Sequence, residues 1–156
     1  MRPRTRHDPR RDLVGFVVGD VSYAVAIGAV REVTLPLRID ALPQAPPAVL
    51  GVADYRGVIV PVIDLRQRFG LPAAPLLRRK WLLCDVGGRQ VALVVDRVSE
   101  VFGTAGAALR PPPLLGTGAD VRGLAGVTEL DGRLVFVLDV MRFAELTAQV
   151  GREKVT

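Results

Sequence analysis

The sequence is poor in the residues on which most catalytic and metal sites depend. Its 156 residues include one cysteine, Cys84, and one histidine, His7. A single cysteine forms no intrachain disulfide, which suits a reducing cytoplasm, and these two side chains are too few for a zinc site of cysteine and histidine. The chain also contains no GxGxxG, Walker or HExxH motif. We therefore predict a protein that is not an enzyme and has no cofactor and no metal site.

Long apolar runs and aromatic side chains are scarce as well. The charge-free runs are far shorter than the roughly 18 apolar residues of a membrane-spanning helix, so no membrane insertion is expected. The aromatic residues are five Phe, two Tyr and one Trp. A nucleic-acid-binding barrel needs a basic face that carries aromatic side chains, and this composition offers few of them.

Positive charge is concentrated at the N-terminus. The net charge is +5, but residues 1–12 hold five Arg and two Asp, so the rest of the chain carries only +2. We predict that residues 1–12 form a disordered basic tail. Because the remainder is nearly neutral, specific nucleic-acid binding is not expected, and a nucleic-acid-binding small β-barrel is the less favoured alternative.

Glycine and proline, in contrast, are abundant. Sixteen Gly and twelve Pro make up about 18% of the chain, against a usual 12%, and indicate a turn-rich, mainly β protein with few short helices. The continuous runs VIVPVI and LVFVL predict strands buried on both faces. Glycine turns such as Gly87-Gly88 separate several of the runs. The predicted strands are Leu13–Val18, Tyr23–Ile27, Val58–Leu65, Trp81–Val86, Val91–Val95 and Leu134–Val140.

An internal repeat organises the chain. Residues Val18–Val33 align without gaps to Val86–Val101 at an offset of 68, with six identities, and Gly51–Asp64 align to Gly126–Asp139 at an offset of 75, also with six. Two copies are too few for a solenoid and instead predict two similar subdomains related by pseudo-symmetry.

The repeat suggests a domain organisation. We predict a domain over residues 13–147 with one subdomain at about 13–70 and a second at about 80–141, a C-terminal helix at about 141–150 and a tail at 151–156. Each half is too short for a secure core of its own, so the halves are expected to share an apolar seam. Small barrels of about five strands per half fit these lengths and leave no long exposed edge.

Arg56 is the first candidate for function. It precedes Gly57 at a predicted turn, where the second copy has Asp131 before Gly132. A repeat keeps what the fold needs in both copies, so an arginine present in one copy suggests contact with a partner, although a solvated surface arginine is equally compatible. Gly57 recurs as Gly132, which favours a structural role. Tyr55 and Gly57 flank Arg56 and are included in the predicted site, where protein interfaces favour Arg and Tyr.

A second group of candidates recurs in both copies. Val30 and Glu32 align with Val98 and Glu100. Their recurrence favours a structural role, with a buried valine and an acid at a turn or short helix.

The motifs together resemble the CheW family of chemosensory adaptors. The segment VGDVSYAV is similar to the family's glycine turn and following strand, and Val30–Val33 resembles its Val-x-Glu-Val element. Pro46–Arg66 matches the family signature that ends in GVIVPVIDLR. Val95–Val101 and Leu130–Asp139 resemble two further family motifs. The resemblance covers about Leu13 to Leu146.

The resemblance implies a fold and a function. The fold would be two SH3-like five-stranded β-barrel subdomains packed on a shared hydrophobic core. The function would be non-catalytic coupling of the cytoplasmic tip of methyl-accepting chemoreceptors to the regulatory domain of a CheA-type histidine kinase, in arrays at the inner face of the membrane. Arg56 looks like the family's signature arginine, and partner contacts are expected at Val30, Glu32 and Gly51, with Val98 added by symmetry.

Two departures from the family pattern lie near this region. Asp54-Tyr55 replaces the usual Asn-Leu before Arg-Gly, and residues 26–28 replace the usual aspartate and bulky apolar residue. They bear on partner identity more than on the fold. An adaptor of a non-flagellar chemosensory pathway, for surface motility or second-messenger control, is therefore the alternative.

Overall fold

The computed structural model describes residues 12–103, 109–111 and 123–145 of the chain. These residues form a mainly β structure with short helical turns, and a helical segment over residues 140–145 follows the last strand. The elements in chain order are β1 (Asp12–Val18), β2 (Val21–Ala26), η1 (Ile27–Ala29), β3 (Val30–Thr34), β4 (Val49–Tyr55), β5 (Val58–Asp64), α1 (Leu65–Arg68), η2 (Leu76–Arg78), β6 (Lys80–Val86), β7 (Arg89–Val95), β8 (Arg97–Gly103), β9 (Leu124–Leu130) and β10 (Arg133–Leu138).

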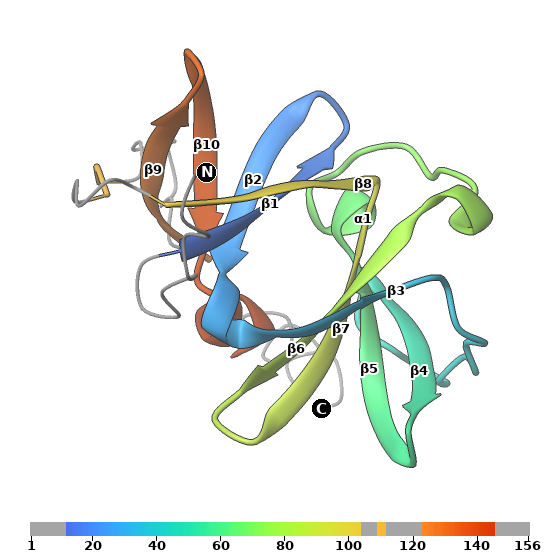
Figure 1. Ribbon diagram of the computed structural model, residues 1–156. Helices are drawn as coiled ribbons and strands as arrows, with labels where there is room; N and C mark the ends of the chain where they lie inside the picture. The colour runs from blue at the N-terminus through green and yellow to red at the C-terminus, as the bar shows by residue number, and fades with distance from the viewer. Residues whose placement is uncertain (1–11, 104–108, 112–122, 146–156) are drawn as a thin grey trace, which may run out of the picture.

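The strands form two five-stranded sheets. The first sheet has the order β8-β1-β2-β10-β9, and the second has the order β3-β6-β7-β5-β4. Figure 1 shows the blue strands β1 and β2 beside the orange strands β9 and β10, although almost the whole chain separates them in sequence.

The repeat exchanges strands between the two sheets. By the alignment, β1 to β5 correspond to β6 to β10, and this substitution converts the order of one sheet into that of the other. The register agrees as well, since Ala24 pairs with Val137 in the first sheet and their counterparts Ala92 and Val62 pair in the second. Each repeat copy therefore gives its first two strands to one sheet and its last three to the other.

Because of this exchange, each sheet contains strands from both repeat copies. The two sheets are not built from residues 13–70 and 80–141. The strands β1 and β2 pair with each other, and their other neighbours are β8 and β10 rather than β3, β4 or β5. The second sheet comes from one continuous stretch, β3 to β7, inserted between β2 and β8 of the first. Parallel pairing of β2 with β10 needs a long connection, and the inserted sheet lies within that connection.

A shared core joins the sheets, as predicted. One cluster of buried residues includes Phe16 and Val25 from the first sheet together with Leu82 and Leu93 from the second. The Tyr23 ring on β2 stacks on Phe69, which follows α1, with ring centroids 4.8 Å apart. Burial of large side chains on both sides contributes roughly 1.5–3 kcal/mol for each, so neither sheet is complete without the other.

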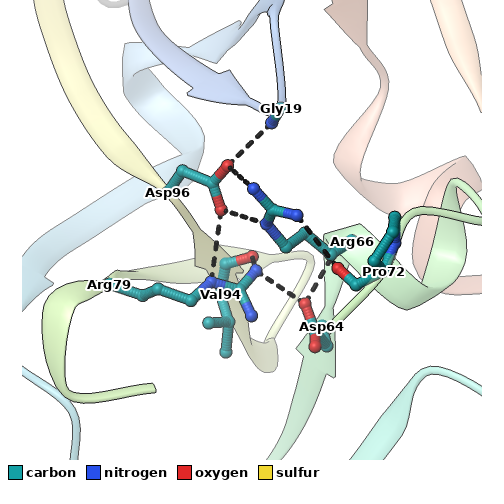
Figure 2. A network of polar contacts seen from close by, with 7 residues as sticks. All are labelled: Gly19, Asp64, Arg66, Pro72, Arg79, Val94 and Asp96. Atoms are coloured by element: carbon teal, nitrogen blue, oxygen red, sulfur yellow. Dashed lines mark hydrogen bonds and ion pairs between the residues drawn. The ribbon is translucent and has the colours of Figure 1, made fainter. Parts of the chain in front are cut away.

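A buried polar network also ties the sheets together (Figure 2). Asp96, between β7 and β8, accepts a hydrogen bond from the Gly19 backbone N–H at the β1–β2 turn and two from the Arg66 guanidinium, at 2.7, 2.9 and 3.0 Å. Arg79, almost fully buried, contacts Asp64 at 2.6 Å and Asp96 at 3.3 Å. Asp64 also caps α1 by accepting a hydrogen bond from the Arg66 backbone N–H.

Several local predictions are confirmed and two are wrong. The six predicted strands are present as β1, β2, β5, β6, β7 and β10, and Gly87-Gly88 forms a two-residue hairpin turn with positive φ at both positions. The region of Val30 and Glu32 is not a turn or short helix but strand β3, and its repeat counterpart is β8. The VIVPVI run is buried only in part, since Val58, Ile59 and Pro61 are exposed.

The structure describes the two chain ends only in part, and Asp12, which was predicted to belong to the N-terminal tail, is the first residue of β1. β1 begins at Asp12, and the rest of the predicted basic tail lies outside the described residues. The predicted C-terminal helix is helical over 140–145, with Phe143 fully buried, and residues 146–156 lie outside the described part.

Candidate partner-binding site

The β4–β5 hairpin presents Arg56 at its tip. Tyr55 and Val58 are the last paired residues, and Arg56 and Gly57 between them have φ of 52° and 85°. Positive φ at both central positions defines the type I′ turn that suits twisted hairpins. The Asp54 side chain closes the turn by accepting a hydrogen bond from the Gly57 N–H at 2.8 Å. The Arg56 side chain is 75% exposed.

Glu32 on β3 links this hairpin to the opposite edge of the second sheet. The Tyr55 hydroxyl donates a hydrogen bond to the Glu32 carboxylate, and the Arg56 guanidinium lies 3.1 Å from the same carboxylate. The guanidinium also lies over the Tyr55 ring, 5.3 Å from its centroid. Because β3 and β4 are at opposite ends of the strand order, the Tyr55–Glu32 contact bridges the two edges of the second sheet through side chains.

The neighbours of Tyr55 keep its phenol protonated. The hydrogen bond to Glu32 and, next, burial of the ring raise the pKa of Tyr55 above its usual value. The phenol therefore stays a donor at neutral pH. The Glu32 carboxylate therefore contacts a neutral donor, the Tyr55 hydroxyl, and a cation, the Arg56 guanidinium. These charge-assisted contacts restrict the position of all three side chains.

The structure brings together some of the predicted residues and separates others. Glu32, Tyr55, Arg56 and Gly57 form one surface cluster. Val30 lies on the same strand as Glu32 but packs partly against the shared core. The other two predicted residues lie away from this cluster.

Gly51 and Val98 have structural surroundings. Gly51 is buried on β4 with φ of 149°, and a Cβ atom there would lie 2.2 Å from the Asp40 carbonyl oxygen. Val98 lies on β8 in the first sheet and packs against the shared core. The structure gives Gly51 a backbone role and places Val98 in a separate hollow on the other sheet.

An apolar groove lies near the cluster, and its lining residues were not among the predicted site residues. It has a volume of about 390 Å³ and lies between the second sheet and the helical segment that follows β10. Gln90 on β7 lines both this groove and the hollow beside Glu32 and Arg56, so the two lie near each other on the second sheet. The apolar side chains of the groove include Val49, Pro61, Ile63, Val91, Met141 and Ala144.

The described residues offer little for chemistry. They contain no group of three or more His, Cys, Asp or Glu side chains that could hold a metal ion. Burial raises the pKa of the Cys84 thiol to about 12, which leaves it unreactive as a nucleophile at neutral pH. None of the helices in the described part is both long and apolar enough to span a bilayer.

Comparisons with known proteins identify the family. A family model for the CheW-like domain matches residues 12–147. The chain is 33% identical over 131 residues to a chemotaxis protein CheW of Rhizobium meliloti, covering 83% of this chain and 84% of the relative. It is 31% identical over 147 residues to protein FrzA of Myxococcus xanthus, covering 94% and 90%. The crystal structure of the scaffolding protein TtCheW from Thermoanaerobacter tengcongensis matches with a TM-score of 0.74 at 27% identity, covering 83% and 88%.

The described residues form two five-stranded sheets that are joined by a shared core. The chain belongs to the CheW-like family, whose members are non-catalytic scaffolds in chemotaxis-type signalling. Its two sheets correspond to the two SH3-like subdomains of that fold.

Proposed function

We propose that this chain couples the cytoplasmic tip of a methyl-accepting chemoreceptor to the regulatory domain of a CheA-type histidine kinase at the inner face of the membrane. Family membership supports an adaptor that acts by binding alone. The observation that carries the receptor half of the proposal is the apolar groove, which shares Gln90 with the hollow at the Glu32–Arg56 cluster.

The groove suits a helical ligand. An amphipathic helix binds by laying its apolar face into such a groove, and the receptor tip is a helical hairpin in this family. Met141 and Pro61 line the groove and supply apolar contact from both walls. Charged and polar residues at the rim, Arg89, Gln90 and Glu145, would fix the position of the helix.

Arg56 is preorganised for this partner. Its contacts with Glu32 and Tyr55 hold a long side chain that would otherwise lose rotamer freedom on binding. The guanidinium remains mostly exposed and can form a bidentate pair with a carboxylate of the receptor.

The kinase half of the proposal uses the edge strands. Val33 on β3 and its repeat counterpart Val101 on β8 are both exposed apolar residues. β3 and β8 have a sheet partner on one side only. A kinase domain with the same pair of barrels would dock against such edges, which offer apolar side chains and unpaired backbone groups.

A second candidate keeps the same binding chemistry but changes the pathway. The chain would then serve a non-flagellar chemosensory system, and this alternative is compatible with a chain whose relatives are not all named as chemotaxis proteins. The receptor that binds the groove distinguishes the two candidates.

A charge reversal tests the receptor site. Arg56→Glu is expected to weaken binding of a receptor tip fragment at least tenfold in a pull-down or titration, while circular dichroism and the melting temperature stay close to wild type. Arg38→Glu is the matched control, because Arg38 is exposed and outside both hollows. A folded Arg56→Glu protein that binds as tightly as Arg38→Glu removes Arg56 from the site.

A further inference from the structure

The outer face of β5 carries an apolar stripe that continues beyond the groove. Side chains two residues apart on a strand lie on the same face, so Ile59, Pro61 and Ile63 form one row. Pro61 and Ile63 line the groove, whereas Ile59 lies beyond it and is 63% exposed. The hairpin tip with Arg56 follows at the end of this row. The apolar surface therefore extends from the groove toward Arg56.

The two sheets differ at this point in their parallel ladders. In the first sheet, β10 pairs with β2 over Val135–Val137, whereas β5 in the second pairs with β7 over Val62–Asp64. Pro61 is the counterpart of Phe136, lies outside the ladder with β7 and has no N–H to donate to it. In Figure 1 the β6–β7 and β4–β5 hairpins point in different directions. β5 is therefore free of β7 at the end that carries Ile59.

The surface has the dimensions of a short helix. Between Ile63 and Ile59 the stripe is about 13 Å long, at roughly 3.3 Å for each strand residue, which is between two and three turns of helix. Leu42 and Met141, both 45% exposed, add apolar surface at the groove end. An extended peptide would need a free strand edge, but β4 pairs along nearly all of β5 and β7 pairs with its last part. A helix packed across the side chains needs no such edge.

We propose that Ile59 is a partner contact, and that the receptor helix lies along β5 from Met141 in the groove to the Arg56 hairpin tip. This inference rests on the proposed function and gives the bound helix a direction and a length. The partner sequence then has apolar residues at helical spacing over about nine positions. An acidic residue follows at the end nearest Arg56, where the exposed guanidinium can pair with it.

The first sheet supplies a matched control. Leu134 aligns with Ile59, is 52% exposed, and faces Glu129 across its hairpin as Ile59 faces Asp54. Ile59→Glu is expected to weaken binding of a receptor tip fragment roughly fivefold or more, because it places a charge against the apolar face of the helix. Leu134→Glu is expected to change the affinity less than about twofold. Equal affinities of the two folded variants overturn the inference.

A labelling experiment separates this inference from the proposed function. Cys84 is buried and is the single cysteine of the chain, so a cysteine placed on the surface can be labelled selectively. Bimane is attached to Ile59→Cys, Leu134→Cys and Met141→Cys, and its emission moves to shorter wavelength when a partner covers it. Added receptor tip is expected to shift the emission at positions 59 and 141 and to leave that at 134 unchanged.

The pattern of shifts decides between the two claims. A shift for Met141→Cys without one for Ile59→Cys overturns the inference and leaves receptor binding in the groove intact. No shift for either, together with no binding of the receptor tip by wild-type protein, contradicts the proposed function and the inference with it.

Discussion

At the scale of single residues, the two glycines of the predicted site have different physical roles. Gly51 is packed against the Asp40 backbone, which is itself held by two hydrogen bonds to Val52 at 2.8 and 2.9 Å. Gly57 is in an open turn, with no atom within 4 Å of an added Cβ. A side chain at position 51 has to displace paired backbone, whereas one at position 57 meets only the strain of a positive φ.

This difference predicts unequal effects of alanine. Gly57→Ala is expected to lower the free energy of unfolding by about 1–2 kcal/mol, the strain of the left-handed conformation. Gly51→Ala is expected to cost about 4 kcal/mol or more, because strain is added to a backbone clash. Urea denaturation of both variants measures the difference. Equal losses would mean that the Asp40 segment can move away freely.

Residue types and spacing predicted part of the site. Arg56 and Gly57 could be placed on a hairpin tip because the repeat showed Asp131-Gly132 in the same position. The contact between Glu32 and Tyr55 could not be predicted, since it depends on β3 and β4 closing from opposite ends of a sheet. Gly51 was assigned to partner binding by resemblance, although its surroundings are those of a structural glycine.

At the scale of elements, Asp96 joins the β1–β2 turn to the second sheet. Burial alone would raise the pKa of Asp96, but the hydrogen bonds from Arg66 and the Gly19 N–H, with the charges of Arg66 and Arg79, hold it below its usual value. The folded state therefore favours the ionised carboxylate. Its contribution to stability is fully present above the unfolded pKa of about 3.9 and is lost as pH falls through the lower folded pKa.

Asp96→Asn is accordingly expected to be less stable than wild type at pH 7. The difference in free energy of unfolding between the two proteins should become smaller as the pH falls below about 4. Urea midpoints at pH 7, 5 and 3 measure the gap. Asp40→Asn is the control, because the Asp40 side chain is 66% exposed and forms a surface ion pair of little value. A gap between wild type and Asp96→Asn that is constant with pH would contradict an ionic role for Asp96.

The strand exchange makes a prediction about fragments. Residues 13–70 contain β1 and β2 without β8 and β10, and they lack β6 and β7 from the centre of the second sheet. This fragment is expected to be unfolded by circular dichroism. A fragment of residues 30–95 contains the whole second sheet and is expected to retain more β structure. A cooperative unfolding transition of the 13–70 fragment would show that the exchange is not needed for folding.

The sequence predicted the elements better than their pairing. Apolar runs bounded by glycine turns located six strands and the Gly87-Gly88 hairpin. The strands β3, β4, β8 and β9 were not predicted. In β3 and β8 no residue is buried and several are charged, so neither forms a continuous apolar run. The pairing of β2 with β10 depends on contacts more than 100 residues apart, which no local pattern contains.

At the scale of the whole molecule, the two pseudo-symmetric sheets share their architecture but differ at their hairpin tips. The sheets share a core, a strand order and two matched edge strands. They differ at the hairpin tips, where one has Arg56 over a tyrosine and the other has Asp131 beside a hollow. A scaffold that must bind unlike partners at once can use this asymmetry, because each barrel then presents a different chemistry on a similar backbone.

The central claim is that this chain bridges a receptor and a kinase, and co-sedimentation tests it most directly. Membrane vesicles that carry the receptor are mixed with the kinase, with and without the protein, and the kinase in the pellet is measured. The account predicts that the kinase sediments with the vesicles when wild-type protein is present and largely fails to do so with Arg56→Glu, which still binds the kinase in solution. Equal sedimentation of the kinase without the protein, or with folded Arg56→Glu, would contradict the account.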